Sequence, residues 1–433
     1  MIPKGIEPIV RVGLIQDRRE IKFSIDKPFF IIPEKGMKIK ITPHEKETWE
    51  ISAYQGLNCN NLSSGEKHEY PKANYIRIEP DDIQKTLTVL HNVTIGIEFH
   101  WQRNEDDVYP YILGIRKTAN KKVMVINELP VEPYLESVIS SEMSGNCPEA
   151  LLKAHAVIAR SWLMAQMENP PHEDYLVCHD DHCQRYQGMW RWTPTASKAV
   201  KETRGEVLTH QGKICDTRYS KSCGGITENF ENCFSPHKIP YCQTIVDASK
   251  NIISRKPDLT REENVRTWVT SRPNTFCNAT PQELEMMLNE YDREIKDLFR
   301  WVVTYSQEEI TQLIERKTHK TLGHLKEIVP GRRGFSGRLL SVDFIGTNGN
   351  IHVGDQLKIR RLLSPTHLYS TCFVVDTEGE KNGIPEKFIL RGGGWGHGVG
   401  LCQIGAAVMS TRGYDYPQIL HHYYRGTELT HAW

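Results

Sequence analysis

The feature that most constrains this 433-residue chain is a run of glycines near its C-terminus. Five of the eight residues from Gly393 to Gly400 are glycine, and only Trp395, His397 and Val399 interrupt them. Glycine loses more conformational freedom on folding than other residues, so such a run indicates a backbone that bends sharply or approaches a partner closely. The spacing fits neither G-x-G-x-x-G nor a P-loop, which argues against a nucleotide site.

Composition excludes several broad classes of protein. Lys plus Arg and Asp plus Glu each number 54, so we expect no nucleic-acid partner. No apolar run approaches the roughly 18 residues that a transmembrane helix needs. Pro, Glu and Arg interrupt the apolar residues of the first twenty positions, which therefore lack the shape of a signal peptide. These patterns do not indicate a particular cellular compartment for the protein.

The chain changes its hydrophobic period along its length. Alternating apolar residues between turn residues predict strands, and a 3.6-residue period predicts helices. The pattern predicts an α+β fold in which a strand-rich body is followed by a central helical pair, an extra helical segment and a C-terminal part. We expect the boundaries to be a strand-rich part at 1–125, the helical pair and a Cys/His segment at 126–245, a helical insertion at 246–335, and a hairpin with the glycine run at 336–433.

Some elements are predicted individually. Period-two patterns predict strands at 9–15, 20–25, 36–43, 74–80, 87–99 and 121–130. Turn residues between short apolar runs predict hairpins at 205–220 and 337–359, the second through Asn348-Gly349. Capped patterns predict helices at 280–291 and 306–317.

One glutamate breaks the pattern of the first helix. Pro133 suits a first turn, and Leu135, Val138 and Ile139 define a buried stripe. Glu142 follows at the i+7 position of that stripe, and we expect the helix to end at Gly145. Burial disfavours a charged carboxylate, which suits a general acid near neutral pH. Two other interpretations stay open: Glu142 lies in water at a frayed helix end, or it pairs with Arg160.

Four segments together resemble the stage II sporulation protein D family, which also includes amidase-enhancer proteins. They are "LPVEPYLESVISSEM…PEALLKAHAVIARSW", "CQRYQG", "YSKSCGGITEN" and "GWGHGVGLCQIGA…YDYPQILHHYYRGTEL". The resemblance runs in order over nearly the whole chain, and residues 250–330 match only loosely. The family pattern usually has glutamine at His155, and a small or apolar residue other than cysteine at Cys402.

The resemblance implies a peptidoglycan lytic transglycosylase that cuts peptide-stripped glycan strands, with Glu142 as its catalytic acid. One carboxylate suffices for this reaction, because it protonates the bridging oxygen and then accepts the proton of the C6 hydroxyl that closes a 1,6-anhydro ring. Ordinary glycosidases need two. The main alternative is a non-catalytic, glycan-binding enhancer of a cell-wall amidase, and a weaker one is a zinc-dependent hydrolase. The family is extracytoplasmic.

If the resemblance holds, the glycine run is expected to contact the glycan substrate. A bare backbone lies flat against a bulky sugar chain while Trp395 stacks on a pyranose face, and His397 bonds the sugar or orients Glu142. Packing in the core is the alternative for Trp395. We expect this loop to form one wall of the cleft that holds Glu142. The expected substrate-binding residues are Arg160, Gln184, Tyr186, Tyr219, Ser222, Trp395, His397 and Gln403.

A compact cluster of cysteines and histidines lies between residues 172 and 183. Two thiolates and two imidazoles make a standard tetrahedral zinc set. Some family members carry a zinc in this segment, which implies a structural ion near the active site. The expected ligands are His172, Cys178, His182 and Cys183, with His179 as the spare. A Cys178–Cys183 disulfide and free buried thiols are the alternatives.

Overall fold

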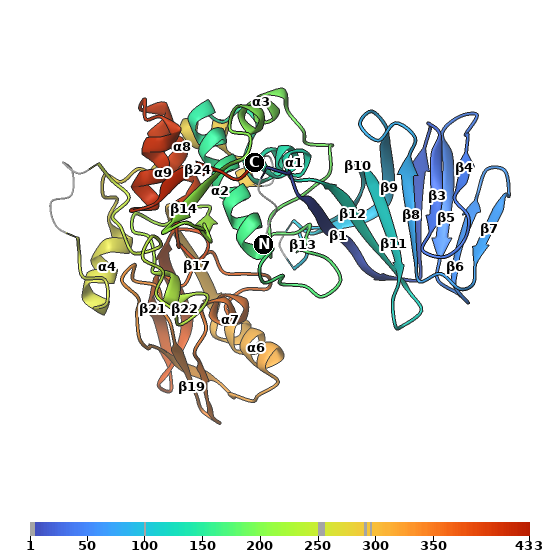
Figure 1. Ribbon diagram of the computed structural model, residues 1–433. Helices are drawn as coiled ribbons and strands as arrows, with labels where there is room; N and C mark the ends of the chain where they lie inside the picture. Colours follow the sequence, from blue (N-terminus) through green and yellow to red (C-terminus); the bar gives the residue numbers. More distant parts are fainter. Residues whose placement is uncertain (1–4, 99–100, 250–255, 290–291, 295–296) are drawn as a thin grey trace.

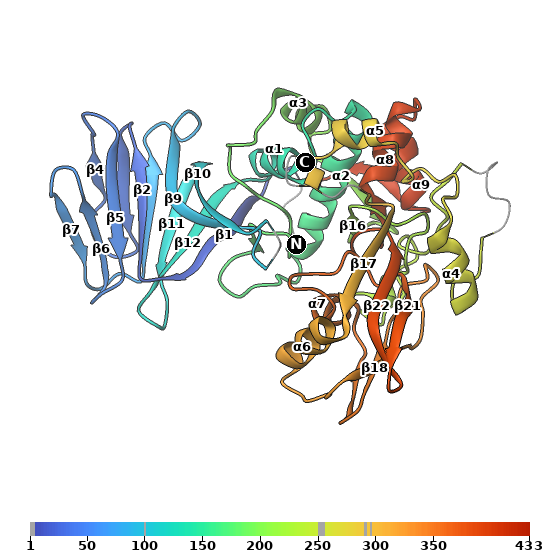
Figure 2. The same ribbon diagram turned by 180° about the vertical axis from the view of Figure 1, so that it is seen from behind.

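The computed structural model describes residues 5–98, 101–249, 256–289, 292–294 and 297–433, and it shows an α+β protein (Figures 1 and 2). Two β-sheets form the N-terminal part, a group of helices occupies the middle, and smaller sheets with their own helices complete the C-terminal part (Figure 1). No helix among the described residues is long and apolar enough to span a membrane.

The N-terminal part is a sandwich of two largely antiparallel sheets. Phe23 and Trp49 of one sheet contact Phe29 of the other edge to face, with ring centroids 6.1 and 5.6 Å apart, and all three side chains are fully buried. The seven-stranded sheet has the order β13 (Val177–Cys178), β1 (Ile9–Arg18), β12 (Val123–Pro130), β11 (Ile112–Lys117), β8 (Tyr75–Pro80), β3 (Phe29–Pro33) and β4 (Ile39–Ile41). The six-stranded sheet has the order β10 (Arg103–Pro110), β9 (Leu87–Ile95), β2 (Glu20–Ile25), β5 (Glu47–Ser52), β6 (Leu57–Asn61) and β7 (Lys67–Tyr70).

A group of packed helices follows the sandwich and shares a core with it. Strand β12 runs directly into α1, because Pro130 ends the strand and stands at the N-cap of the helix. Helix α2 is buried over most of its length, since it packs against each of the other four helices of this group. The group comprises α1 (Val131–Glu142), α2 (Glu149–Gln166), α3 (Pro194–Glu202), α8 (Gln403–Thr411) and α9 (Tyr416–Tyr423).

Small sheets complete the C-terminal half. One joins β15 (Lys213–Ile214), β14 (Glu206–His210) and β24 (Glu428–His431), and a parallel pair joins β16 (Tyr219–Ser220) to β23 (Leu401–Cys402). Two more have the orders β17 (Arg300–Ser306), β22 (Ile384–Gly393), β21 (Phe373–Lys381) and β18 (Leu325–Pro330), β19 (Val342–Gly346), β20 (Asn350–Val353). The helices of this half are α4 (Glu262–Thr270), α5 (Pro281–Met287), α6 (Gln307–Thr318) and α7 (Gln356–Leu362), with 3-10 turns at Phe230–Asn232 and Asp292–Glu294.

The prediction of an α+β fold is confirmed, and so are most of the predicted strands. Both hairpins form, as β14–β15 and β19–β20. Helix α6 begins with the predicted capping box of Ser306 and Glu309, and α5 carries a second box of Thr280 and Glu283. Residues 290–291 of the predicted 280–291 helix, and residue 99 of the predicted 87–99 strand, lie outside the described residues.

Two predictions about local structure are wrong. The segment 246–335 is not purely helical, because Arg300–Ser306 forms β17 and pairs with β22 more than eighty residues later in the chain. The second strand of the 337–359 hairpin ends at Val353, because the Asp355 side chain accepts the Lys358 N–H and starts α7. A short alternating run is ambiguous until its partner strand is known.

The glycine run folds as a loop between β22 and β23, and four of its glycines, Gly394, Gly396, Gly398 and Gly400, have positive φ. Gly400 is the most constrained, because a Cβ atom there would lie 1.9 Å from the backbone oxygen of Arg218. Its backbone therefore needs glycine both for its φ of +71° and for its contact with the segment that carries β16.

We predict that Gly400→Ala destabilises the protein far more than Gly413→Ala does. Both glycines have positive φ, but a Cβ at Gly413 would meet nothing within 4 Å. The control should therefore lose only the roughly 1–2 kcal/mol of left-handed strain, whereas Gly400→Ala adds a clash with backbone and should lose about 3 kcal/mol or more. Chemical denaturation of both variants measures this, and equal losses would contradict the close approach.

Candidate functional site

A pocket of about 210 Å³ lies where the helical group meets the glycine loop. Segments far apart in the sequence line it: the end of α1, the loop before α3, β16 with the residues after it, the glycine loop and the start of α8. It brings together seven of the residues singled out from the sequence, namely Glu142, His182, Cys183, Tyr219, Trp395, His397 and Gln403. The glycine loop thus shares a pocket with Glu142 although some 250 residues separate them.

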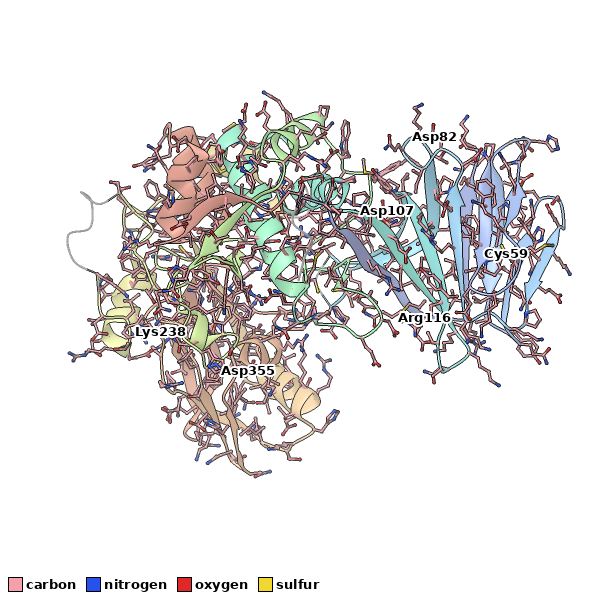
Figure 3. All side chains as sticks on the ribbon, in the orientation of Figure 1. Cys59, Asp82, Asp107, Arg116, Lys238 and Asp355 are labelled. Carbon is pink, nitrogen blue, oxygen red and sulfur yellow. The ribbon has the colours of Figure 1, made fainter. Side chains whose placement is uncertain are left out.

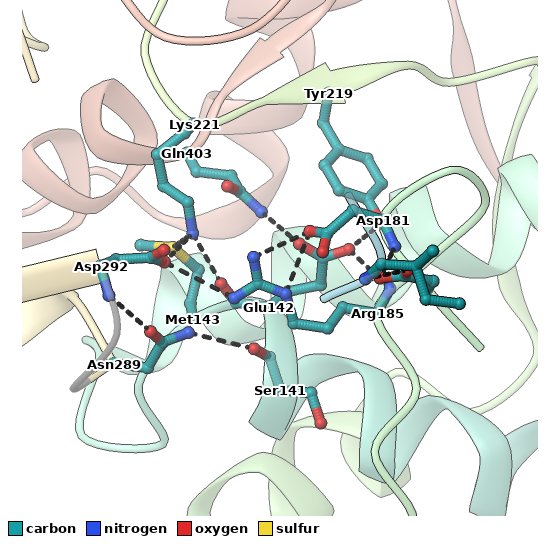
Figure 4. Close-up of polar contacts among 12 residues, drawn as sticks. Ser141, Glu142, Met143, Asp181, Arg185, Tyr219, Lys221, Asn289, Asp292 and Gln403 are labelled. Atoms are coloured by element: carbon teal, nitrogen blue, oxygen red, sulfur yellow. Dashed lines mark hydrogen bonds and ion pairs between the residues drawn. The ribbon is translucent and has the colours of Figure 1, made fainter. Parts of the chain in front are cut away.

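Glu142 is the last residue of α1, and it is buried, with only 7% of its surface exposed. Its Oε1 accepts the Tyr219 hydroxyl at 3.0 Å and the Arg185 backbone N–H at 3.1 Å. Its Oε2 accepts the Gln403 amide at 3.4 Å, and Lys221 Nζ bonds its backbone carbonyl at 2.8 Å (Figure 4). The side chain therefore lies neither in water nor against Arg160.

The helix ends three residues before the predicted position. Met143 has extended backbone, with φ −132° and ψ 166°, and this stops α1 at Glu142. Gly145 has another purpose, because a Cβ there would lie 2.3 Å from the Thr193 hydroxyl. The glycine thus allows the start of α3 to pack closely on the turn between α1 and α2.

Two buried ion pairs surround Glu142 (Figure 4). Arg185 contacts Asp181 at 2.8 Å, and Lys221 contacts Asp292 at 2.8 Å, with Arg185 3.7 Å from the same Asp292 carboxylate. Burial raises the pKa of Asp181, and the neighbouring Glu142 adds to this, although Arg185 acts in the opposite direction. The site therefore holds alternating charges out of water, where they interact more strongly than at the surface.

These four charged residues are site residues that the sequence reasoning missed. Arg185 lies inside "CQRYQG" and Lys221 inside "YSKSCGGITEN", so both motifs were located, but of the members chosen from them only Tyr219 lines the pocket. The selected neighbours were Gln184, Tyr186 and Ser222, whereas the pocket is lined by Arg185 and Lys221. In extended chain, adjacent side chains point to opposite sides, so an error of one position moves a residue out of the site.

The remaining predicted substrate-binding residues are buried behind the pocket wall. Arg160 pairs with Glu132 at 2.7 Å, and neither side chain reaches solvent to any extent. Tyr186 donates its hydroxyl to Asn127 at 2.5 Å. The prediction that Arg160 and Tyr186 contact substrate finds no support, because both side chains are occupied in the core.

Gln184 and Ser222 are also buried, but each adjoins a residue of the pocket. Gln184 stands in the chain between the pocket residues Cys183 and Arg185, and it accepts the Tyr134 hydroxyl at 3.0 Å. The Ser222 backbone pairs with that of Trp395 through two hydrogen bonds of 3.1 and 2.7 Å. Both residues therefore support the site from outside it.

His397 is held neutral inside the glycine loop. Its Nδ1 accepts the Val399 N–H at 3.0 Å, and its ring meets Phe234 edge to face. Burial lowers the pKa of His397 to about 3, and the positive charges of Arg218 and Arg338 add to this. The side chains that hydrogen-bond the Glu142 carboxylate are Tyr219 and Gln403, so the orienting role suggested for His397 belongs to them.

His155 stands at the position where the family pattern usually has glutamine, and it supports Gln403. The Gln403 Nε2 lies 3.0 Å from His155 Nε2 and 3.4 Å from Glu142 Oε2, so its two amide protons can serve both. Burial lowers the pKa of His155 to about 3, with Lys221 contributing, so the imidazole is neutral and accepts. A histidine thus fixes the amide that faces the carboxylate.

The four predicted ligands of the Cys/His cluster lie close enough together to hold one metal ion. One ligand atom from each of His172, Cys178, His182 and Cys183 lies within 4.8 Å of all the others. His172 Nε2 is 3.3 Å from Cys183 Sγ. The spare, His179, directs both ring nitrogens at backbone carbonyls, those of Gly13 at 3.0 Å and Thr94 at 2.9 Å, so it is not available as a ligand.

Two family models match the chain. The model of the stage II sporulation protein matches residues 119–210, and that of a domain of unknown function, DUF8618, matches residues 228–400. The first match includes α1, α2 and the Cys/His cluster, and the second includes the glycine loop.

Three curated proteins are similar to the chain. An uncharacterized protein of Brachyspira hyodysenteriae is 28% identical over 312 residues, covering 72% of this chain and 69% of the relative. The stage II sporulation protein D of Bacillus amyloliquefaciens is 22% identical over 338 residues, 75% of this chain and 80% of the relative. The amidase enhancer of Bacillus subtilis is 23% identical over 305 residues, 68% of this chain but only 40% of that protein.

The fold and the site define an α+β protein with a buried carboxylate in a pocket, and the family whose model matches residues 119–210 is associated with cell-wall hydrolysis and modification. As its shared segments indicated, the chain is similar to the stage II sporulation protein D family, through the family-model match at residues 119–210 and through the stage II sporulation protein D and amidase-enhancer relatives.

We predict that His155 makes the protein sensitive to acid. An unfolded histidine gains its proton as the pH falls through about 6.5, whereas buried His155 does not until about pH 3, so the free energy of unfolding falls with pH between these values. His155→Gln should reduce this slope by up to about 1.4 kcal/mol per pH unit. Denaturation series at several pH values test this, with the exposed His237→Gln as control, and an unchanged slope in His155→Gln would contradict a neutral buried imidazole.

Proposed function

We propose that this protein is a peptidoglycan lytic transglycosylase with Glu142 as its single acid and base. The observation that carries the proposal is the position of Glu142: a buried carboxylate at a helix end that opens into a pocket, held by Tyr219 and Gln403. Similarity to the stage II sporulation protein D family supports the reaction class, since that family is associated with cell-wall hydrolysis and modification.

The contacts of Glu142 suit both halves of such a reaction. In the first half the protonated carboxyl delivers its proton to the bridging glycosidic oxygen as the bond to C1 breaks. In the second half the carboxylate takes the proton of the C6 hydroxyl of the same muramic residue, whose oxygen attacks C1 and closes the anhydro ring. Three hydrogen-bond donors stabilise the carboxylate between these steps.

The surrounding charges suit a cationic transition state. Positive charge develops on the sugar as the glycosidic bond breaks, and preorganised negative groups in a buried site stabilise it most effectively. Asp181 and Asp292 both line the pocket, and each is balanced in the ground state by Arg185 or Lys221. Trp395 and the bare backbone at Gly396 supply a surface on which a pyranose ring can lie.

We also propose that the Cys/His cluster holds a structural zinc ion. The four residues supply the two thiolates and two imidazoles of a common tetrahedral site, and their ligand atoms are close enough for one ion. Because four protein ligands complete the shell, the ion would stabilise the loop that carries Cys183 and Arg185 and would leave the chemistry to Glu142. This argues against the zinc-hydrolase alternative.

We predict that Glu142→Gln abolishes glycan cleavage while the fold is retained. Loss of a general acid typically costs 10²–10⁴-fold, and one group serves both steps here, so the loss should lie at the upper end. The assay incubates peptide-stripped glycan strands with the protein and detects anhydro-muramic ends by mass spectrometry.

Glu136→Gln is the matched control, because Glu136 lies on the same helix and bonds Trp192 Nε1 outside the pocket. Near wild-type turnover by Glu142→Gln would contradict its role. A wild-type protein that forms no anhydro ends but stimulates a cell-wall amidase would favour the alternative suggested by the amidase-enhancer relative.

We predict that Cys183→Ala removes one equivalent of zinc and lowers the melting temperature more than it weakens glycan binding, because a structural ion contributes folding free energy. His179→Gln is the control, since His179 bonds only backbone carbonyls and its replacement should leave the zinc content unchanged. A Cys178–Cys183 disulfide without zinc would show this proposal to be wrong.

A further inference from the structure

A second group of potential ligands lies behind the pocket, in the protein core. One ligand atom from each of Cys223, Asp247, Cys277 and Cys402 lies within 4.8 Å of all the others. No member is more than 3% exposed. The four residues come from four separate segments of the chain. Cys223 lies in the loop after β16, Asp247 lies further along before α4, Cys277 precedes α5, and Cys402 is the N-cap of α8.

We propose that these four side chains bind a second structural metal ion, most suitably zinc, through three thiolates and one carboxylate oxygen. The proposal does not depend on the catalytic activity.

The distances fit one tetrahedral ion. Zinc–sulfur bonds of about 2.3 Å place two tetrahedral sulfur ligands about 3.8 Å apart. The Sγ atoms of Cys223 and Cys277 are 3.6 Å apart, and Cys223 Sγ lies 3.4 Å from Asp247 Oδ2. An iron–sulfur cluster would need its cysteine sulfurs more widely spaced, because the cluster itself lies between them. The spacing therefore selects a single ion.

The carboxylate of Asp247 is held as a ligand would be. Its Oδ1 accepts the Tyr423 hydroxyl at 2.7 Å and lies 3.5 Å from His422 Nε2. Its Oδ2 faces the sulfur of Cys223. A fully buried carboxylate beside thiols is costly without a compensating positive charge, and a divalent ion among the four supplies one.

Cys402 shows a second sign of ligation. Its Sγ accepts backbone N–H groups from Cys223 at 3.2 Å and Gly405 at 3.4 Å. Such outer hydrogen bonds orient and stabilise ligating atoms in metal sites. Gly405 also leaves the necessary space, since a Cβ there would lie 2.4 Å from Asp247 Oδ2.

The second site would fix the catalytic pocket from behind. Cys402 directly precedes Gln403, whose amide contacts Glu142, and Cys223 directly follows Ser222, whose backbone pairs with Trp395. One ion bound to both cysteines therefore sets the floor and one wall of the pocket relative to each other. A disulfide would join only two of the three thiols, and one that included Cys223 would remove the thiol that faces Asp247 Oδ2.

The test is a count of metal in matched variants, purified under reducing conditions without added metal. Wild-type protein should contain two zinc ions per chain, the Cys178→Ala/Cys183→Ala variant one, the Cys277→Ala variant one, and the combined variant none. Cys59→Ala is the control, since Cys59 is a buried thiol on β6 in the distant sandwich, and it should retain two ions (Figure 3).

A second measurement keeps the test decisive if Cys277→Ala does not fold. In the Cys178→Ala/Cys183→Ala background, substitution with Co²⁺ should give thiolate-to-cobalt charge-transfer absorption. Cys223, Cys277 and Cys402 should resist alkylation until a chelator is added. No metal and no cobalt absorption in that background, or a Cys223–Cys277 disulfide, would overturn the proposal. If Cys277→Ala lost zinc and Cys178→Ala/Cys183→Ala did not, the proposal for Cys223, Asp247, Cys277 and Cys402 would stand, and the zinc ion proposed at the Cys/His cluster would be contradicted.

Discussion

The site depends on the backbone pairing between the segment after residue 218 and the glycine loop. Parallel bridges join Tyr219 to Leu401 and Ser220 to Cys402, and an antiparallel bridge joins Ser222 to Trp395. This pairing brings strands from the middle and the end of the chain to the C-terminal end of α1. Positive φ angles at alternate glycines let the loop follow its partner so closely that a single Cβ would meet backbone atoms. The absence of side chains at these glycines is therefore required by the contact with the paired segment of the protein, as well as by any contact with sugar.

The polar groups around Glu142 show why this pairing matters. Tyr219 and Lys221 reach the glutamate from one paired segment, and Gln403 reaches it from the other. A buried carboxylate is costly to hold unless its oxygens are satisfied, so the site is stable only when both segments are in register. The same donors that satisfy the buried carboxylate would also hold it in place for the proposed chemistry. Stability and the proposed function would therefore depend on the same contacts, and a defect in either segment should affect both.

Sequence reasoning located the motifs but not the register within them. Glu142, Trp395, His397 and Gln403 line one pocket, as the family resemblance implied. The four members of the Cys/His cluster lie together as well, because ligand chemistry at short spacing is a property of local sequence. Arg185 was missed because Gln184 and Tyr186 flank it, and which of three consecutive side chains faces a cavity depends on a loop conformation that has no periodic signature. Strand β17 was missed because its partner β22 is remote in sequence. The second sulfur cluster was missed for the same reason, since its members have no common spacing.

The two sulfur clusters also suggest how a pocket built from remote segments stays rigid. A catalytic carboxylate must be held to within a fraction of an ångström, whereas loops without regular structure move more than this. A cross-link between remote residues restricts the unfolded chain, and its benefit grows with the length of chain that it closes. One ion at Cys183 would hold the loop that carries Arg185, and a second at Cys402 would hold Gln403, so the two would act on opposite sides of Glu142. The large apolar core would then position the helices, and the two ions would add a few strong bonds at the charged pocket, where apolar side chains are few.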